Sequence, residues 1–225
     1  MSDTYEIEIK SLLGEEKNAD SLREKLREID PTLEASSSYS QVNHYFEGGD
    51  LHTLSQALRK YLNDDSIKKI ELIAKKGSHV SIRSREMNGQ ARMVVKASIG
   101  EDSSSNGVAR LEVEEPVACS LSVLDELILS CGYSYQAKWS RKREEYKLGD
   151  ITVCLDKNAG YGYLAEFEKV VTNPEDAEKT KNELYAFMER LGVTELSQER
   201  IERMFAYYNE HWPDYYGTDK VFVIE

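Results

Sequence analysis

A two-residue alternation of charged and apolar side chains recurs along this chain and restricts the folds open to it. In the first such segment the apolar set is Tyr5, Ile7 and Ile9, and the charged set is Glu6, Glu8 and Lys10. Successive side chains of a β-strand point to opposite faces, whereas a helix repeats every 3.6 residues. The alternation therefore predicts strands with one charged face and one apolar face.

Further strands and several helices follow from the same reading of the pattern. Strands are predicted at 40–46, 68–74, 79–86, 91–98, 108–115, 134–148, 150–157 and 162–171, and a short one within the tail 213–225. Helices are predicted at 20–30, 50–62, from Ser120 or Ser122 to Gly132, from Pro174 to Gly192, and at 197–210. Asn88-Gly89 and Gly149-Asp150 are turn signals between neighbouring strands. Hairpin-linked strands favour an antiparallel α+β fold over a doubly wound parallel sheet.

The charged faces carry pairs of like charge two residues apart. The carboxylate pairs are Glu6/Glu8, Glu112/Glu114 and Glu166/Glu168, and the guanidinium pairs are Arg83/Arg85 and Arg141/Arg143. A single strand of this kind is explained by an ordinary solvated sheet face. Adjacent like charges are destabilising without an opposite charge between them, and a divalent cation bound to a polyphosphate supplies both signs. If the sheet closes into a barrel, its charged interior must hold water, ions or ligand.

The overall composition limits the kinds of binding partner and the cellular compartment expected for this chain. The formal net charge of −12 makes the chain a poor general partner for nucleic acid or an anionic membrane. The three cysteines lack metal-ligand spacing and predict reduced thiols. No run approaches the roughly 18 apolar residues of a membrane span, and the first residues lack a signal-peptide core. We therefore expect a cytoplasmic protein.

Six short motifs together resemble the CYTH superfamily, the triphosphate tunnel metalloenzymes. The chain has EIEIK at 6–10 for ExExK, IRSR at 82–85 for RxR, and RLEVE at 110–114 for RxExE. Lys96 in VVKAS, RKREEY at 141–146 and LDKNAGYGYLAEFE at 155–168 resemble the later motifs. Arg141 departs from the lysine that is usual in the family. The stretch 50–78 and the tail beyond about residue 210 are additional segments relative to the family pattern.

The resemblance implies a closed antiparallel barrel of about eight strands that forms a charged tunnel flanked by helices. It implies a tunnel domain over 1–195, with a C-terminal helix and tail at 196–225 packed on it or extending it. Implied metal ligands, for Mg²⁺ or Mn²⁺, are Glu6, Glu8, Glu166 and Glu168. Implied phosphate contacts are Lys10, Arg83, Arg85, Lys96, Arg141 and Arg143, and implied catalytic residues are Lys10, Glu112, Glu114 and Asp156.

The leading functional hypothesis is a divalent-metal-dependent hydrolase acting on inorganic tripolyphosphate or an organic or nucleoside triphosphate. The alternative within the family is a class IV adenylyl cyclase, which makes cyclic AMP and pyrophosphate from ATP. A third reading is a module that binds polyphosphate or nucleotide without turnover. The expected partner is a small triphosphate molecule, with no nucleic acid and no membrane. The apolar stripe of 197–210 is expected to serve either core packing or a homodimer interface.

Overall fold

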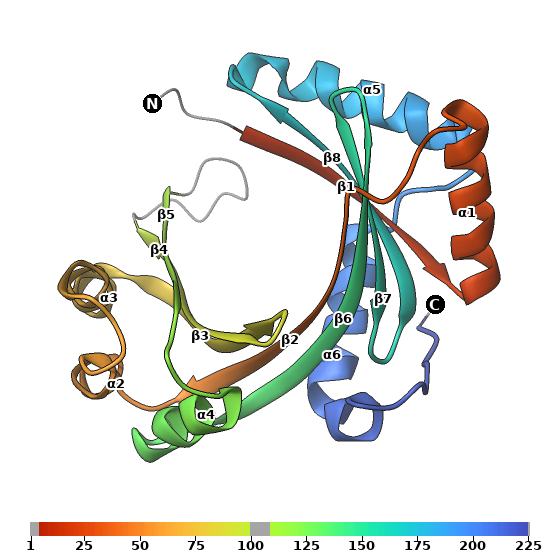
Figure 1. Ribbon diagram of the computed structural model, residues 1–225. Helices are drawn as coiled ribbons and strands as arrows, with labels where there is room; N and C mark the ends of the chain where they lie inside the picture. The colour runs from red at the N-terminus through yellow and green to blue at the C-terminus, as the bar shows by residue number, and fades with distance from the viewer. Residues whose placement is uncertain (1–4, 100–108, 225) are drawn as a thin grey trace. The chain divides into compact units, whose positions relative to one another are not determined.

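The computed structural model describes residues 5–99 and 109–224 of the 225-residue chain (Figure 1). The strands are β1 (Tyr5–Gly14), β2 (Ser37–Gly48), β3 (Ser78–Met87), β4 (Gln90–Ile99), β5 (Ala109–Pro116), β6 (Tyr133–Leu148), β7 (Ile151–Asn158) and β8 (Gly162–Val171). The α-helices are α1 (Glu16–Ile29), α2 (Leu51–Leu58), α3 (Asp64–Lys76), α4 (Leu121–Ser130), α5 (Ala177–Arg190) and α6 (Gln198–Tyr215). A short 3₁₀ helix, Pro174–Asp176, precedes α5.

The strands form one eight-stranded sheet in the order β1-β8-β7-β6-β2-β3-β4-β5. The ladders with a described register are antiparallel, so the predicted antiparallel α+β fold is confirmed. Within residues 5–99 and 109–224 no hydrogen-bonded ladder joins the end strands β1 and β5. Closure into a barrel therefore stays a prediction, as does the division into 1–195 and 196–225.

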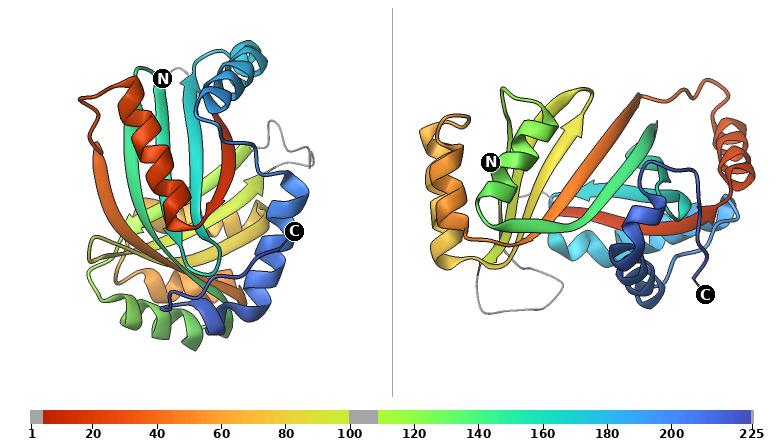
Figure 2. Two further views of the ribbon diagram at one scale, coloured as in Figure 1. Left: turned by 90° about the vertical axis from the view of Figure 1, so that its right-hand side faces the viewer. Right: turned by 90° about the horizontal axis from the view of Figure 1, so that it is seen from below.

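The chain forms two compact units. We call Met1–Ser40 with Ser140–Glu225 the first unit and Gln41–Trp139 the second unit. In the first unit, α1 and α5 both pack against β1 and β8 (Figure 2). Their core includes Ile9, Leu22 and Phe167, which are at most 3% exposed. The apolar face predicted for the first strand is thus the face that the helices cover.

In the second unit, α3 and α4 pack on the apolar side of the sheet. The predicted strand at 68–74 is wrong, because these residues belong to α3. The side chain of Asn63 caps this helix by accepting a hydrogen bond from the Ser66 N–H. Ile67, Ile70 and Ile73 then fall at helical spacing, and all three are buried in the core.

Turn chemistry and helix ends account for the other boundaries. Asn88 and Gly89 both have positive φ, 53° and 77°, as a tight hairpin between β3 and β4 requires. The last helix is longer than predicted, since α6 runs through Pro213 in its final turn to Tyr215. The short strand expected in the tail is reduced to a single bridge between Gly160 and Val221. No helix of 5–99 or 109–224 is both long and apolar enough to cross a bilayer.

Candidate functional site

Predicted site residues from four strands share one face of the first unit. In the β1–β8 ladder Glu8 lies opposite Glu168, and Lys10 lies opposite Glu166. In the β6–β7 ladder Arg143 lies opposite Asp156. Glu6 lies on the same face by register, opposite Val170, although its side chain is not described. We call the charged side chains of this face the acidic cluster: Glu8, Lys10, Arg141, Arg143, Asp156, Glu166 and Glu168.

Arg143 occupies the centre of the acidic cluster and is only 8% exposed. Its Nε and Nη2 donate to the two carboxylate oxygens of Asp156 at 2.7 and 2.6 Å. Nη2 also donates to Glu166, and Arg141 adds a third bond to Asp156 at 3.1 Å. Burial lowers the pKa of Arg143, but the hydrogen bond to Asp156 and the charges of Glu166 and Asp156 outweigh it and raise the pKa. The guanidinium is therefore permanently charged and fixed in orientation.

Glu166 is held ionised within this arrangement. Burial raises its pKa, but the charges of Arg143, Lys10 and Arg141 outweigh burial, so the net pKa is lowered. Lys10 Nζ lies 3.1 Å from Glu166 and also contacts Glu8. Lys10 thus connects the carboxylates of two neighbouring strands.

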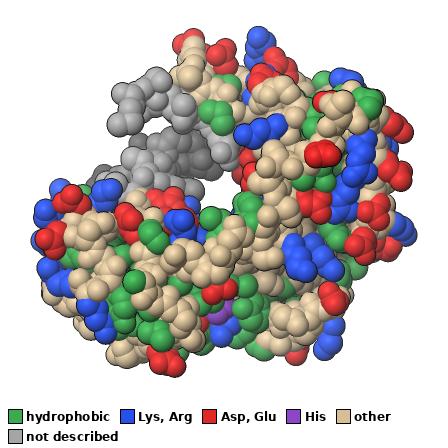
Figure 3. Space-filling view, in the orientation of Figure 1, with side chains coloured by type: hydrophobic (Ala, Val, Ile, Leu, Met, Phe, Trp, Pro, Cys, Tyr) green, Lys and Arg blue, Asp and Glu red, His purple; other side chains and the backbone are tan. Residues whose placement is uncertain are grey.

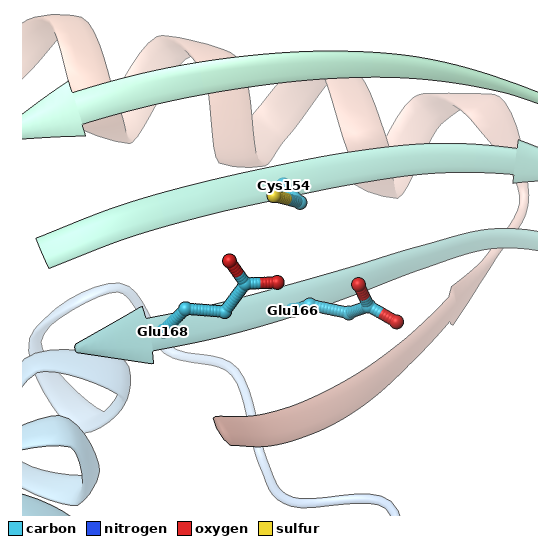
Figure 4. Close-up of side chains that lie close together, drawn as sticks. All are labelled: Cys154, Glu166 and Glu168. Atoms are coloured by element: carbon cyan, nitrogen blue, oxygen red, sulfur yellow. The ribbon is translucent and has the colours of Figure 1, made fainter. Parts of the chain in front are cut away.

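Three side chains of the first unit could surround a metal ion (Figure 4). One ligand atom each from Cys154, Glu166 and Glu168 lies within 4.8 Å of the others. Burial raises the pKa of the Cys154 thiol, which leaves it protonated at neutral pH and unsuited to ligate as a thiolate. The remaining donors are carboxylate oxygens, which suit a hard ion such as Mg²⁺ or Mn²⁺ better than zinc. The side chains present therefore fit the metal that the sequence implied.

The predicted basic residues of the second unit also share one face of the sheet. We call Arg83, Arg85, Arg92, Lys96, Glu112 and Glu114 the basic cluster. Lys96 pairs with Glu112 at 2.8 Å, and Arg85 pairs with Glu114 at 2.6 Å. Lys96, Arg85 and Arg92 thus share two carboxylates of this cluster as ion-pair partners, an arrangement that can accept an anion.

Two residues of β2 orient these arginines and were missed in the reading of the sequence. Asn43 Oδ1 accepts a hydrogen bond from Arg85 Nε at 2.7 Å. The ring of Tyr45 lies 4.6 Å from the Arg83 guanidinium, as in a cation–π contact. The available signal was the alternation in QVNHYF, which puts Asn43 and Tyr45 on one face of the strand.

A buried polar network lies on the opposite side of the same strands. Asp125 of α4 accepts hydrogen bonds from Ser84 and from Tyr135, the latter at 2.8 Å, and lies 2.7 Å from His44 Nδ1. His44, Ser84 and Asp125 are at most 6% exposed. Because its polar groups are paired and enclosed, this network anchors α4 to β2 and β3.

Away from these clusters, the surface visible in Figure 3 mixes the two signs of charge. Acidic and basic side chains are interspersed across that face. In the two clusters, by contrast, strand register defines the partners of each charged side chain.

Comparison with solved structures places the fold among known ones. The PH1819 protein of Pyrococcus horikoshii OT3 has a TM-score of 0.55 and 20% identity, covering 90% of this chain and 99% of that one. A Vibrio parahaemolyticus protein proposed to be an adenylate cyclase has a TM-score of 0.53 and 14% identity, covering 90% and 98%. HpAC1 from Hippeastrum has a TM-score of 0.50 and 16% identity, covering 92% and 96%. HpAC1 is described as a proposed adenylyl cyclase with a dominant triphosphatase activity.

At these identities, the structural similarity establishes a shared fold. No curated protein sequence matches the chain. The family model for the CYTH domain matches residues 71–201, which is more than half of the 225 residues. The chain therefore belongs to the CYTH domain family, the group of triphosphatases and adenylyl cyclases that its motifs resemble.

Proposed function

We propose that this chain is a divalent-metal-dependent hydrolase of inorganic tripolyphosphate or of an organic or nucleoside triphosphate. The observation that carries the proposal is that each unit gathers charged side chains on one face of its strands. The first unit gathers the carboxylates Glu8, Glu166 and Glu168, whereas the second unit gathers more basic than acidic side chains. Hydrolysis of a metal-bound triphosphate requires both kinds of group. The triphosphatase activity described for HpAC1, a protein of similar fold, supports this choice over cyclisation.

In this proposal Glu166, Glu168 and Glu8 hold Mg²⁺ or Mn²⁺, and Glu6 joins them from the same strand face. When bound, such an ion neutralises charge on phosphate oxygens and lowers the pKa of a coordinated water. Arg143 keeps Glu166 ionised and in place through its hydrogen bond.

The basic residues bind and orient the substrate. Lys10, Arg83, Arg85, Lys96, Arg141 and Arg143 contribute positive charge toward the phosphate oxygens. Asn43 fixes the plane of the Arg85 guanidinium, which limits the entropy lost when an anion binds. Glu112 and Glu114 of the second unit orient the attacking water, and Asp156 of the first unit is a further catalytic carboxylate.

The test measures orthophosphate release from tripolyphosphate by the full chain with Mg²⁺ or Mn²⁺. Glu8→Gln is expected to abolish the metal-dependent release, because the amide keeps the shape but removes the charge that the ion requires. Glu183→Gln is the matched control, since Glu183 pairs with Lys169 of β8 away from the acidic cluster, at 2.6 Å. This control is expected to keep full activity.

Full activity in Glu8→Gln would refute the assignment. Incubation with ATP separates the rival reactions, because a cyclase produces cyclic AMP and pyrophosphate, whereas a hydrolase releases orthophosphate. Binding of triphosphate with neither product would identify a non-catalytic module instead.

A further inference from the structure

Arg92 of β4 has an unusual set of neighbours in the basic cluster. In the β3–β4 ladder it lies directly opposite Arg85, and in the β4–β5 ladder it lies opposite Pro116. Glu114 Oε2 lies 2.6 Å from Arg85 Nη1, whereas Glu114 Oε1 lies 3.9 Å from Arg92 Nη1. One carboxylate is thus shared by two guanidiniums, and Arg92 has the weaker contact.

The Nε–H of Arg92 also lacks a hydrogen-bond acceptor among the described residues. The Nε atom is buried and has no hydrogen-bond partner within the described part of the chain, although the side chain as a whole is 28% exposed. A buried donor without a partner destabilises the folded state, and so do two like charges directly opposite on adjacent strands. An oxyanion that contacts the exposed part of the Arg92 guanidinium, next to Arg85, would offset the repulsion between the two positive charges.

Arg92 also extends the reach of the basic cluster along the strand. It lies four residues from Lys96 on the same face of β4, a separation of about 13 Å at the usual strand rise. Arg83 lies opposite Val94, in the register row between those of Arg92 and Lys96. Basic side chains therefore occupy three successive rows, which suits an anion with several phosphates in line better than a single orthophosphate.

We propose that Arg92, together with Arg85, binds a phosphoryl group of an extended condensed phosphate. The identity of the anion rests on the proposed function, whereas the charge geometry is that of the second unit alone. Arg92 is then retained for binding at the expense of the stability of the unliganded protein. A residue that strengthens anion binding but lowers the stability of the unliganded protein has a binding role and not a structural one.

The experiment measures tripolyphosphate binding to the full chain by isothermal titration calorimetry in EDTA, so that neither metal nor turnover is required. Arg92→Gln is expected to weaken binding by about 10- to 100-fold, the range for losing one charge-assisted hydrogen bond. The unliganded variant is expected to melt at the same temperature as the parent chain or higher. Arg59→Gln is the matched control, because exposed Arg59 of the same unit pairs with Glu71 at 2.7 Å.

Two results would overturn the inference. One is tripolyphosphate binding by Arg92→Gln within about twofold of the parent chain. The other is a lower melting temperature for unliganded Arg92→Gln, which would assign Arg92 a structural role. A parent chain that binds no tripolyphosphate would refute both proposals. Arg92-dependent binding without any hydrolysis would refute the proposed function alone and leave this inference standing.

Discussion

Replacing Arg143 with Gln removes the cation that holds two buried carboxylates. Asp156 is 1% exposed and Glu166 is 8% exposed. Arg143 makes two hydrogen bonds to Asp156, at 2.7 and 2.6 Å, and another to Glu166. Arg143→Gln therefore leaves both carboxylates buried with much less positive charge around them.

The expected loss of unfolding free energy depends on which positive charges still contact the two carboxylates after the substitution. Removing one partner of a buried ion pair typically costs about 3–5 kcal/mol of unfolding free energy. Arg141 still donates to Asp156, and Lys10 still lies 3.1 Å from Glu166, so the lower end of the range applies. A loss of about 3 kcal/mol lowers the melting temperature of a chain of this size by roughly 6–12 °C. Urea unfolding followed by circular dichroism measures the free energy directly.

The loss of stability in Arg143→Gln should be greater at neutral pH than at acidic pH. In the parent chain the net pKa of Glu166 is lowered from its usual 4.5, because nearby positive charges outweigh burial. A carboxyl with a lowered pKa contributes stability that is complete above its unfolded pKa and disappears as pH falls through its folded pKa. Without Arg143 the largest of these positive contributions is lost, so the pKa of Glu166 rises. The difference between Arg143→Gln and the parent should therefore be largest near neutral pH and shrink below about pH 4.5.

A matched variant shows whether the effect comes from burial. Arg203→Gln removes a guanidinium from an exposed pair with Glu199 on α6, at 2.5 Å, and should cost at most about 1 kcal/mol. Equal losses in the two variants would refute the reasoning. So would a loss in Arg143→Gln that stays constant from about pH 3.5 to 8, because charge burial would then not be its cause.

Two further substitutions test the fold that supports the clusters. Asp125→Ala should cost about 3 kcal/mol or more by urea unfolding, because His44, Ser84 and Tyr135 lose a shared buried acceptor; an unchanged midpoint would contradict the network. Gly160→Ala should cost about 1–3 kcal/mol by thermal melting, because a Cβ would lie 2.6 Å from the Tyr208 ring at a φ of +87°. Gly89→Ala has a positive φ but no steric conflict, so a loss as large as that of Gly160→Ala would contradict the packing argument.

Much of the local structure could be predicted from the sequence. The alternation in β1 correctly assigned Ile9 to the core, at 3% exposed, and Glu8 to the other, exposed face. This works because the two-residue period is a property of the extended backbone and needs no partner strand. The turn at Asn88-Gly89 is equally local, since positive φ favours these residue types. The motif pattern also identified the family correctly.

The error at 68–74 shows a limit of reading short apolar segments. Isoleucines at 67, 70 and 73 carry helical spacing, and Asn63 is a helix cap, so the correct signal was present. A short apolar run is ambiguous between strand and helix until its packing is known. In the second unit, burial of these isoleucines in the core against the sheet selects the helix.

The sequence by itself determined which residue types alternate on each strand, and hence that carboxylates and guanidiniums share faces. Only the tertiary structure decided which of them meet. The β1–β8 register places Glu8 opposite Glu168 and Lys10 opposite Glu166, and the β2–β3 register places Asn43 opposite Arg85. These pairs join strands that are distant in the chain, and the packing of whole elements sets their register, so no local pattern could specify them. By contrast, the turns at Asn88-Gly89 and Gly149-Asp150 already imply that Arg85 faces Arg92 and that Arg143 faces Asp156.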